Sequence, residues 1–198
     1  MRHAPRAMPD APPPRDREGA LLVAYANGDA GAARDLTASL APRALAVAAR
    51  MLGDRAEAED VTQEAMLRLW RVAPAWRQGE ARVATWLHRV VSNLCLDRIR
   101  QRRGVGLEEV AEPADPAPSV AERMAGDERV AALHAAIGRL PERQRLAVSL
   151  RHLDGLSNPE VAAVMDIGVE AVESLTARGR RALATILSGR KEELGHDG

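Results

Sequence analysis

The stretch SNPEVAAVMDIGVEAVES, residues 157–174, decides the fold of the second half of the chain. Ser157 can cap a helix, Pro159 suits the first turn of that helix, and Glu160 stands three residues after the serine, as a capping box requires. Gly168 is a candidate for the tight turn before a second helix. The pattern predicts a helix-turn-helix, whose second helix is free to enter a DNA major groove.

The second helix of this motif carries candidate DNA contacts on its outward face. Arg178 and Arg181 are natural phosphate ligands or guanine readers, and Ser174 lies on the same face. Glu173 repels phosphate, although a carboxylate can accept a hydrogen bond from cytosine N4. The alternative is a helix pair with no DNA-binding role, because any two helices that meet at a tight turn need a cap, a small residue and a glycine.

Working outward, apolar residues recur at spacings of three and four along nearly all of the chain, and no run alternates as a strand would. We therefore expect an all-α protein, with helices over residues 17–27, 30–52, 55–72, 85–103, 127–138, 141–152, 158–165 and 169–187.

Composition shifts divide this helical chain into five parts. Residues 1–16 are rich in proline and predict a disordered arm, and residues 17–103 form the first helical domain. Residues 104–128 carry 7 acidic and 1 basic side chains with little to bury, which predicts a flexible acidic linker. Residues 129–188 form the second domain, with the helix-turn-helix, and residues 189–198 are a tail.

Overall composition excludes several classes of protein. The 198 residues balance 28 basic against 28 acidic side chains, so the chain is not a uniformly basic nucleic-acid binder. A single cysteine, Cys95, excludes a disulfide scaffold and a multi-thiolate metal site. No apolar run reaches the ~20 residues that span a bilayer. We expect a cytoplasmic protein without cofactor, metal or small-molecule substrate, and, since no catalytic motif is recognisable, not an enzyme.

One helix of the first domain carries a candidate protein-binding face. Its members recur at spacings of three and four, and they combine both charges with a leucine, which suits a protein partner better than DNA. An ordinary solvated face is the alternative. The members are Asp60, Gln63, Glu64, Leu67 and Arg68.

The next helix has features that suit contact with an opened DNA strand. Asn93 has an amide that can donate and accept hydrogen bonds at a base edge. Trp76, in the loop before the helix, could stack on a base, or it could be a core residue. Four arginines lie at the C-terminal end of this helix, with no acidic residue near them in the sequence except Asp97. We expect them to bind DNA phosphates: Arg98, Arg100, Arg102 and Arg103.

Several motifs in order resemble those of the extracytoplasmic-function (ECF) sigma factors of RNA polymerase. In the first half these are AEDVTQEAMLRLW at 58–70, TWLHRVVSN at 85–93 and DRIR at 97–100. In the second half they are LPERQR at 140–145 and LRHLDGLS at 150–157. The family's recognition helix commonly has cations where Glu173 and Leu175 stand here, which leaves the −35 sequence preference open.

The resemblance implies a role for each candidate surface. The face around Asp60 would dock on core RNA polymerase, Asn93 and its helix would read the −10 element of promoter DNA, and the helix-turn-helix would read the −35 element. It also implies an anti-sigma factor, often bound to a membrane, that holds the protein inactive. Two rival hypotheses are a stand-alone helix-turn-helix regulator, which needs no polymerase, and a helical protein-interaction adaptor.

Overall fold

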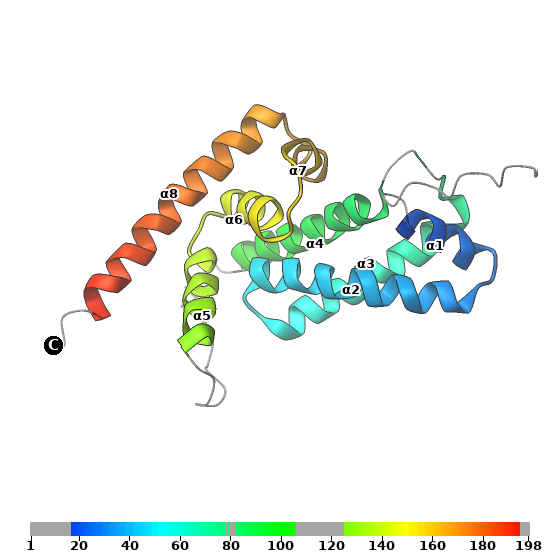
Figure 1. Ribbon diagram of the computed structural model, residues 1–198, viewed down its shortest axis with the longest axis horizontal. Helices are drawn as coiled ribbons and strands as arrows, with labels where there is room; N and C mark the ends of the chain where they lie inside the picture. Colours follow the sequence, from blue (N-terminus) through cyan, green and yellow to red (C-terminus); the bar gives the residue numbers. More distant parts are fainter. Residues whose placement is uncertain (1–16, 78, 80–81, 106–124, 195–198) are drawn as a thin grey trace, which may run out of the picture.

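The computed structural model describes residues 17–77, 79, 82–105 and 125–194, and these residues form helices joined by short turns (Figure 1). None of the described residues is in a strand, which confirms the all-α prediction. The predicted arm and residues 106–124 of the predicted linker lie outside the described residues. The elements, where η marks a short 3-10 or π segment, are α1 Arg17–Ala26, α2 Ala30–Leu52, α3 Arg55–Val72, η2 Ala73–Ala75, α4 Val83–Val105, α5 Ala125–Gly138, α6 Glu142–Val148, η3 Ser149–Leu153, α7 Asn158–Met165 and α8 Val169–Leu194.

Local sequence signals explain where the long helices begin and end. The Asp29 carboxylate accepts hydrogen bonds from the first backbone amides of α2, and Asp54 accepts from Glu57 at the start of α3. Gly53 ends α2 with a φ of 70°, a left-handed conformation that glycine adopts without a steric penalty. Pro42 lies inside α2 without ending it, so α2 keeps its predicted length.

Several predicted boundaries differ from the structure. The last helix continues to Leu194, seven residues beyond the predicted end at 187 and into the predicted tail. The helix predicted over 141–152 is α6 followed by the π-helical segment η3, in which the Asp154 amide donates to the Ser149 carbonyl at 3.0 Å. The helix predicted over 85–103 begins at Val83 and ends at Val105. The ends of the predicted linker therefore belong to α4 and α5.

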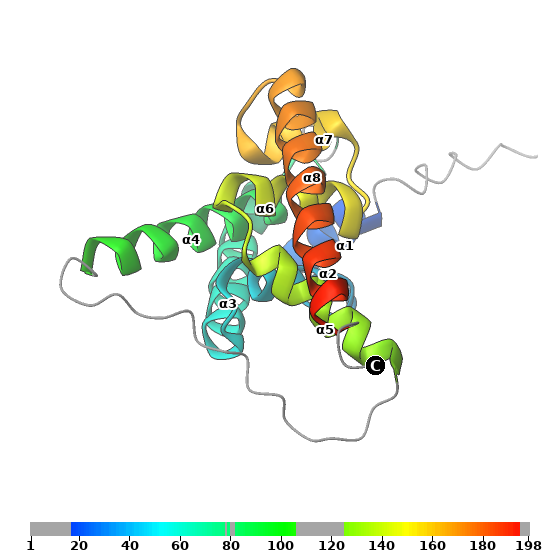
Figure 2. The same ribbon diagram turned by 90° about the vertical axis from the view of Figure 1, so that its left-hand side faces the viewer.

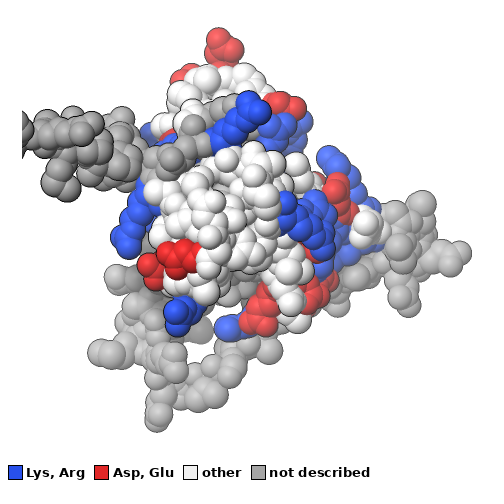
Figure 3. Space-filling model, turned by 90° about the vertical axis from the view of Figure 1, so that its right-hand side faces the viewer, with Lys and Arg blue, Asp and Glu red and all other residues white. Residues whose placement is uncertain are grey.

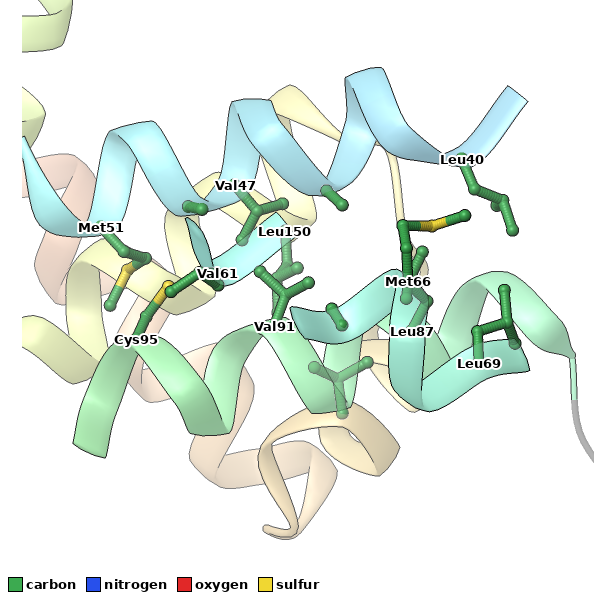
Figure 4. Close-up of a cluster of buried hydrophobic side chains, with 14 of the residues drawn as sticks. Leu40, Val47, Met51, Val61, Met66, Leu69, Leu87, Val91, Cys95 and Leu150 are labelled. Atoms are coloured by element: carbon green, nitrogen blue, oxygen red, sulfur yellow. The ribbon is translucent and has the colours of Figure 1, made fainter. Parts of the chain in front are cut away.

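The core of the first half lies between α2, α3 and α4 (Figure 4). Helical spacing predicts an inner stripe of Val61, Ala65, Leu69 and Val72 on α3. The first three are fully buried, and Val72 is half-buried. The three buried residues meet Val47 and Met51 of α2 across the core. Burying such aliphatic side chains contributes about 1.5–3 kcal/mol each and fixes how the three helices cross.

The inner face of α4 is not the predicted one. Helical spacing in the sequence predicts that Trp86, Val90, Leu94 and Ile99 lie near the inner face, but these residues are only partly buried against the core. The fully buried stripe is displaced by one position because α4 packs against α2 and α3 on one side and α7 on another, so apolar residues occur around most of its circumference. The buried stripe consists of Val83, Leu87, Val91 and Cys95.

The second half of the chain packs directly on the first. Helices α6 and α7 lie beside α2 and α4 in both ribbon views (Figures 1 and 2). Leu150 of η3 reaches the cluster that Val61 and Val91 form in the first half (Figure 4). The buried hydrophobic cluster is therefore continuous between the two halves.

The surface carries both signs of charge. Figure 3 shows arginines and acidic side chains interspersed around an uncharged centre on one face of the molecule. Among the described residues, no helix is both long and apolar enough to cross a membrane. Nor does the described part of the chain hold a cluster of three or more histidine, cysteine or acidic side chains that could bind a metal ion.

Candidate nucleic-acid and protein interfaces

The helix-turn-helix forms with the predicted first helix. Ser157 and Glu160 make a complete capping box, in which the Ser157 amide donates to Glu160 Oε2 at 2.9 Å and the Glu160 amide donates to Ser157 Oγ at 3.4 Å. The hydrogen bonds from Ser157 lower the pKa of the Glu160 carboxyl. Val172 of the second helix is fully buried in the angle between α7 and α8.

The turn between the two helices is built differently from the prediction. The left-handed residue is Asp166, with a φ of 54°, and Gly168 does not have a positive φ. Asp166 ends α7 by donating its amide to the Ala162 carbonyl. Aspartate tolerates this conformation better than most residues, so the chain needs no glycine there.

Gly179, which the sequence analysis did not single out, lies where α8 crosses α6. A Cβ atom at this position would come within 2.5 Å of Val148 Cγ2 and 3.5 Å of the Gln144 carbonyl oxygen. The absence of a side chain therefore lets α8 lie against α6. Glycine is unfavourable inside a helix, so its presence at this position could have indicated a close packing contact.

We predict that Gly179→Ala destabilises the protein, whereas Gly168→Ala does not. Overpacking costs about 1–3 kcal/mol, which exceeds the ~1 kcal/mol that alanine gains over glycine inside a helix. An added Cβ at Gly168 meets only Glu170 Oε2, at 3.6 Å. Urea unfolding followed by circular dichroism measures both variants, and equal midpoints would show that the α6–α8 crossing can relax.

The candidate −35 residues on α8 are accessible. Glu173, Ser174, Arg178 and Arg181 are all exposed. Glu173 accepts a hydrogen bond from Asn158 Nδ2 at 3.4 Å, and Arg178 Nε donates to the Ser174 carbonyl at 3.3 Å. Glu173, which stands where the family commonly has a cation, thus contacts Asn158 at the start of α7. A shallow hollow of about 360 Å³ beside Arg181 is lined by Ala177, Arg180, Arg181 and Ala184.

The candidate protein-binding face lies along α3. Asp60, Gln63 and Arg68 are exposed, and Leu67 keeps 43% of its surface accessible, which is unusual for a leucine in this chain. Glu64 is half-buried, and its carboxylate accepts from Arg68 Nε at 2.8 Å. This hydrogen bond lowers the pKa of the Glu64 carboxyl. The five residues therefore form one accessible face of mixed charge around an exposed leucine.

Asn93 and Trp76 lie in different environments. Asn93 is exposed on α4, so its amide is free to meet a nucleotide. Trp76 is half-buried and packs edge-to-face on Trp86, with 6.2 Å between ring centroids. The Trp76 indole Nε1 is buried without a hydrogen-bond partner. Trp76 is therefore partly a core residue, which leaves less of its ring for stacking on a base.

The four arginines at the end of α4 are more compensated than the sequence analysis expected. Arg100 pairs with Asp97 at 3.1 Å, as local spacing suggests. The other three reach acids that are distant in the sequence, which local counting could not detect. These pairs are Arg98 with Asp60 at 3.9 Å, Arg102 with Glu57 at 2.5 Å and Arg103 with Glu142 at 2.6 Å.

Two titratable side chains of α4 are buried. Cys95 is fully buried, which raises the pKa of its thiol to about 12, so it is a small core residue. His88 is 6% exposed, and its Nδ1 lies 2.7 Å from the Ala84 carbonyl oxygen, so Nδ1 carries the proton in the neutral ring. His88 Nε2 is buried without a partner.

We predict that acid destabilises the protein through His88. Burial lowers the pKa of His88, Arg43 and Arg50 lower it further, and Asp154 and the Ala84 carbonyl oppose the shift. The unfolded chain therefore binds a proton at a higher pH than the folded chain, so stability falls as the pH drops below about 6.5, the ordinary pKa of histidine.

Urea midpoints between pH 7 and pH 5 test this prediction. His88→Gln should lose less stability over that range than the natural chain, and His134→Gln, at an exposed position, should behave like the natural chain. Parallel loss in the natural chain and His88→Gln would assign the acid sensitivity to other groups.

Comparison with known families and proteins agrees with this arrangement. Residues 36–105 match Sigma-70 region 2, and residues 131–183 match Sigma-70, region 4. The ECF RNA polymerase sigma factor SigE of Mycolicibacterium smegmatis is 33% identical over 187 residues, which cover 91% of this chain and 72% of SigE. The RNA polymerase sigma-H factor of Pseudomonas aeruginosa is 31% identical over 180 residues, which cover 85% of this chain and 93% of sigma-H.

Solved structures agree as well. CnrH, in complex with the cytosolic domain of CnrY, superimposes with a TM-score of 0.65 at 26% identity, over 88% of this chain and 99% of CnrH. The sigma factor RpoE of Bartonella quintana, in complex with the anti-sigma factor NepR, gives a TM-score of 0.67 over 78% of this chain and 96% of RpoE. At 20% identity, this second likeness supports the fold alone.

A region 2 followed by a region 4 that contains a helix-turn-helix defines the class of RNA polymerase sigma factors. Within that class, the chain belongs to the ECF family. It is therefore a transcription initiation factor, which joins core RNA polymerase and directs it to promoter DNA.

Proposed function

We propose that this sigma factor divides its work among three exposed helix faces. The face of α3 around Asp60 and Leu67 binds core RNA polymerase. Helix α4 reads the −10 element through Asn93, while Trp76 and the arginines at its C-terminal end hold the adjoining strand. Helix α8 reads the −35 element through Glu173, Ser174, Arg178 and Arg181. The observation that carries the proposal is that the mixed-charge face of α3 and the candidate DNA-contacting face of α8 are both accessible on one chain.

The proposed domain boundaries follow from the same division of labour. Residues 17–103 form the polymerase-docking and −10 domain, and residues 129–188 form the −35 domain. The family matches over 36–105 and 131–183 support these boundaries. Residues 104–128 connect the two domains.

We also propose that an anti-sigma factor, such as one bound to a membrane, holds the protein inactive in the cytoplasm. Support comes from the solved relative CnrH, at 26% identity, whose structure contains the cytosolic domain of CnrY. The chain performs no catalytic step in this scheme, because the polymerase supplies the chemistry. The rival hypothesis of a stand-alone helix-turn-helix regulator accounts for α7 and α8 but not for the match of residues 36–105 to Sigma-70 region 2.

Transcription from a defined promoter tests the proposal. The purified chain is mixed with core RNA polymerase and a library of promoter fragments, and the transcripts are sequenced. The proposal expects stoichiometric co-purification with core polymerase and a shared −35 and −10 sequence upstream of the new start sites. Tight binding of duplex DNA by the chain alone, without polymerase association, would favour the stand-alone regulator.

A further inference from the structure

Four ion pairs join the two halves of the described chain, and all four have the same polarity. Each pairs an arginine from residues 17–105 with an acid from residues 125–194, although the chain as a whole is neutral. Chance placement would mix the two polarities. The pairs are Arg50 with Asp154, Arg82 with Glu160, Arg89 with Asp166 at 3.7 Å, and Arg103 with Glu142 at 2.6 Å.

The pair of Arg50 and Asp154 is the best shielded from water. Arg50 Nη2 donates to both Asp154 oxygens at 2.7 and 2.6 Å, and each side chain is only 11% exposed. Nearby, Arg145 Nη1 donates to the Met51 carbonyl at the end of α2 at 2.7 Å. The other three arginines are more than 50% exposed, so salt screens their pairs more readily.

These contacts involve the helix that is proposed to meet promoter DNA. Arg82 immediately precedes α4, and Arg89 lies on α4 one turn before Asn93. Arg103 is one of the candidate −10 residues. The partner acids Glu160 and Asp166 belong to the helix-turn-helix, so carboxylates of the −35 domain lie where DNA phosphates would otherwise be attracted.

The contact between the halves is incompatible with reading both promoter elements together. The −10 and −35 elements are about 25 base pairs apart, or about 85 Å along B-form DNA. In the structure α7 packs against α4, and Leu150 lies in the core of the first half. The two halves must therefore separate before both elements are bound.

We propose that the structure is a closed resting state, in which the acids of the helix-turn-helix half bind the arginines of the first half and compete with promoter DNA. This inference rests on the proposed function of α4 and α8. The buried pair of Arg50 and Asp154 is the principal lock, and the three exposed pairs make the closed state sensitive to salt. Opening returns both charges to water, so reversing one of them favours separation of the halves over global unfolding.

Energy transfer within the full chain tests the lock. Dyes are attached at Thr37→Cys on α2 and Ser188→Cys on α8, both exposed positions, while the buried Cys95 thiol stays unlabelled. In the natural chain the transfer efficiency should fall as added salt separates the halves. Asp154→Arg should lower the transfer, and adding Arg50→Asp, which swaps the two charges, should restore it.

Binding of a mixed-sequence single-stranded DNA oligonucleotide provides the second readout. A closed population of roughly 90% weakens apparent affinity about tenfold, so Asp154→Arg should bind about tenfold tighter than the natural chain. Reversing the exposed Glu59, which pairs with Arg55, with Glu59→Arg adds the same charge outside the contact between the halves and away from the arginines at the end of α4, and so controls for charge alone. Equal gains in the two variants would overturn the inference.

The remaining outcomes are also decisive. Unchanged transfer in Asp154→Arg, or no recovery in the charge-swapped variant, would refute the lock. If Asp154→Arg does not fold, the salt titration of the natural chain and the charge-swapped variant still test whether the pair of Arg50 and Asp154 locks the halves together. Core polymerase co-purification in the same preparations separates the two claims, because the lock can fail while polymerase association persists.

Discussion

Asp60→Arg is expected to abolish association with core RNA polymerase while leaving the fold intact. The Asp60 side chain is 69% exposed on α3, so the new arginine meets no steric barrier within the protein. The aspartate also faces Arg98 at 3.9 Å, and the variant loses this weak pair. Reversing a charge at the centre of an interface typically costs about 2 kcal/mol or more, which corresponds to a loss of roughly thirtyfold in affinity.

The measurement is co-purification with core polymerase, followed by titration of a labelled chain. Glu59→Arg is the matched control, because Glu59 is the adjacent acid on α3, is also exposed, and pairs with Arg55 away from the proposed face. Circular dichroism should show the same helix content in both variants. Retained association of Asp60→Arg, or equal loss in Glu59→Arg, would remove Asp60 from the docking face.

Sequence reasoning succeeded where a signal was local. The capping residues Ser157 and Glu160 predicted the start of α7, because the side chains that start a helix lie within a few positions of the backbone groups that they satisfy. The burial of Val61 along α3 followed from a single apolar stripe. The accessible face of α3 followed from the same periodicity, since it lies on the side of the helix opposite the buried stripe.

Sequence reasoning failed where a partner was distant in the chain. The arginine at position 102 seemed uncompensated until folding brought Glu57 to 2.5 Å from it. The inner face of α4 was misassigned because α7 covers a second side of that helix, and periodicity shows only that several faces are apolar. Gly179 could not be interpreted without Val148, which lies across a helix crossing. The same limit hid the contact between the two halves.

Asn93→Ala is expected to reduce promoter opening far more than polymerase binding. Asn93 is exposed on α4, so the substitution removes no internal contact and should not change stability. Its amide is the group proposed to hold an unstacked base of the −10 element, and a lost base contact costs about 1–3 kcal/mol. That cost corresponds to a decrease of roughly five- to 150-fold in open complexes.

Permanganate footprinting of the melted promoter measures this effect, and co-purification measures polymerase binding on the same preparation. Gln101→Ala is the matched control, since Gln101 carries the same amide group on the same helix and is also exposed. Loss of opening in Asn93→Ala alone would assign the base contact to this position on α4. Equal loss of opening and of polymerase binding would instead mean that Asn93 belongs to the docking surface. Equal effects in both variants would mean that any side-chain amide on α4 supports the DNA strand through the DNA backbone.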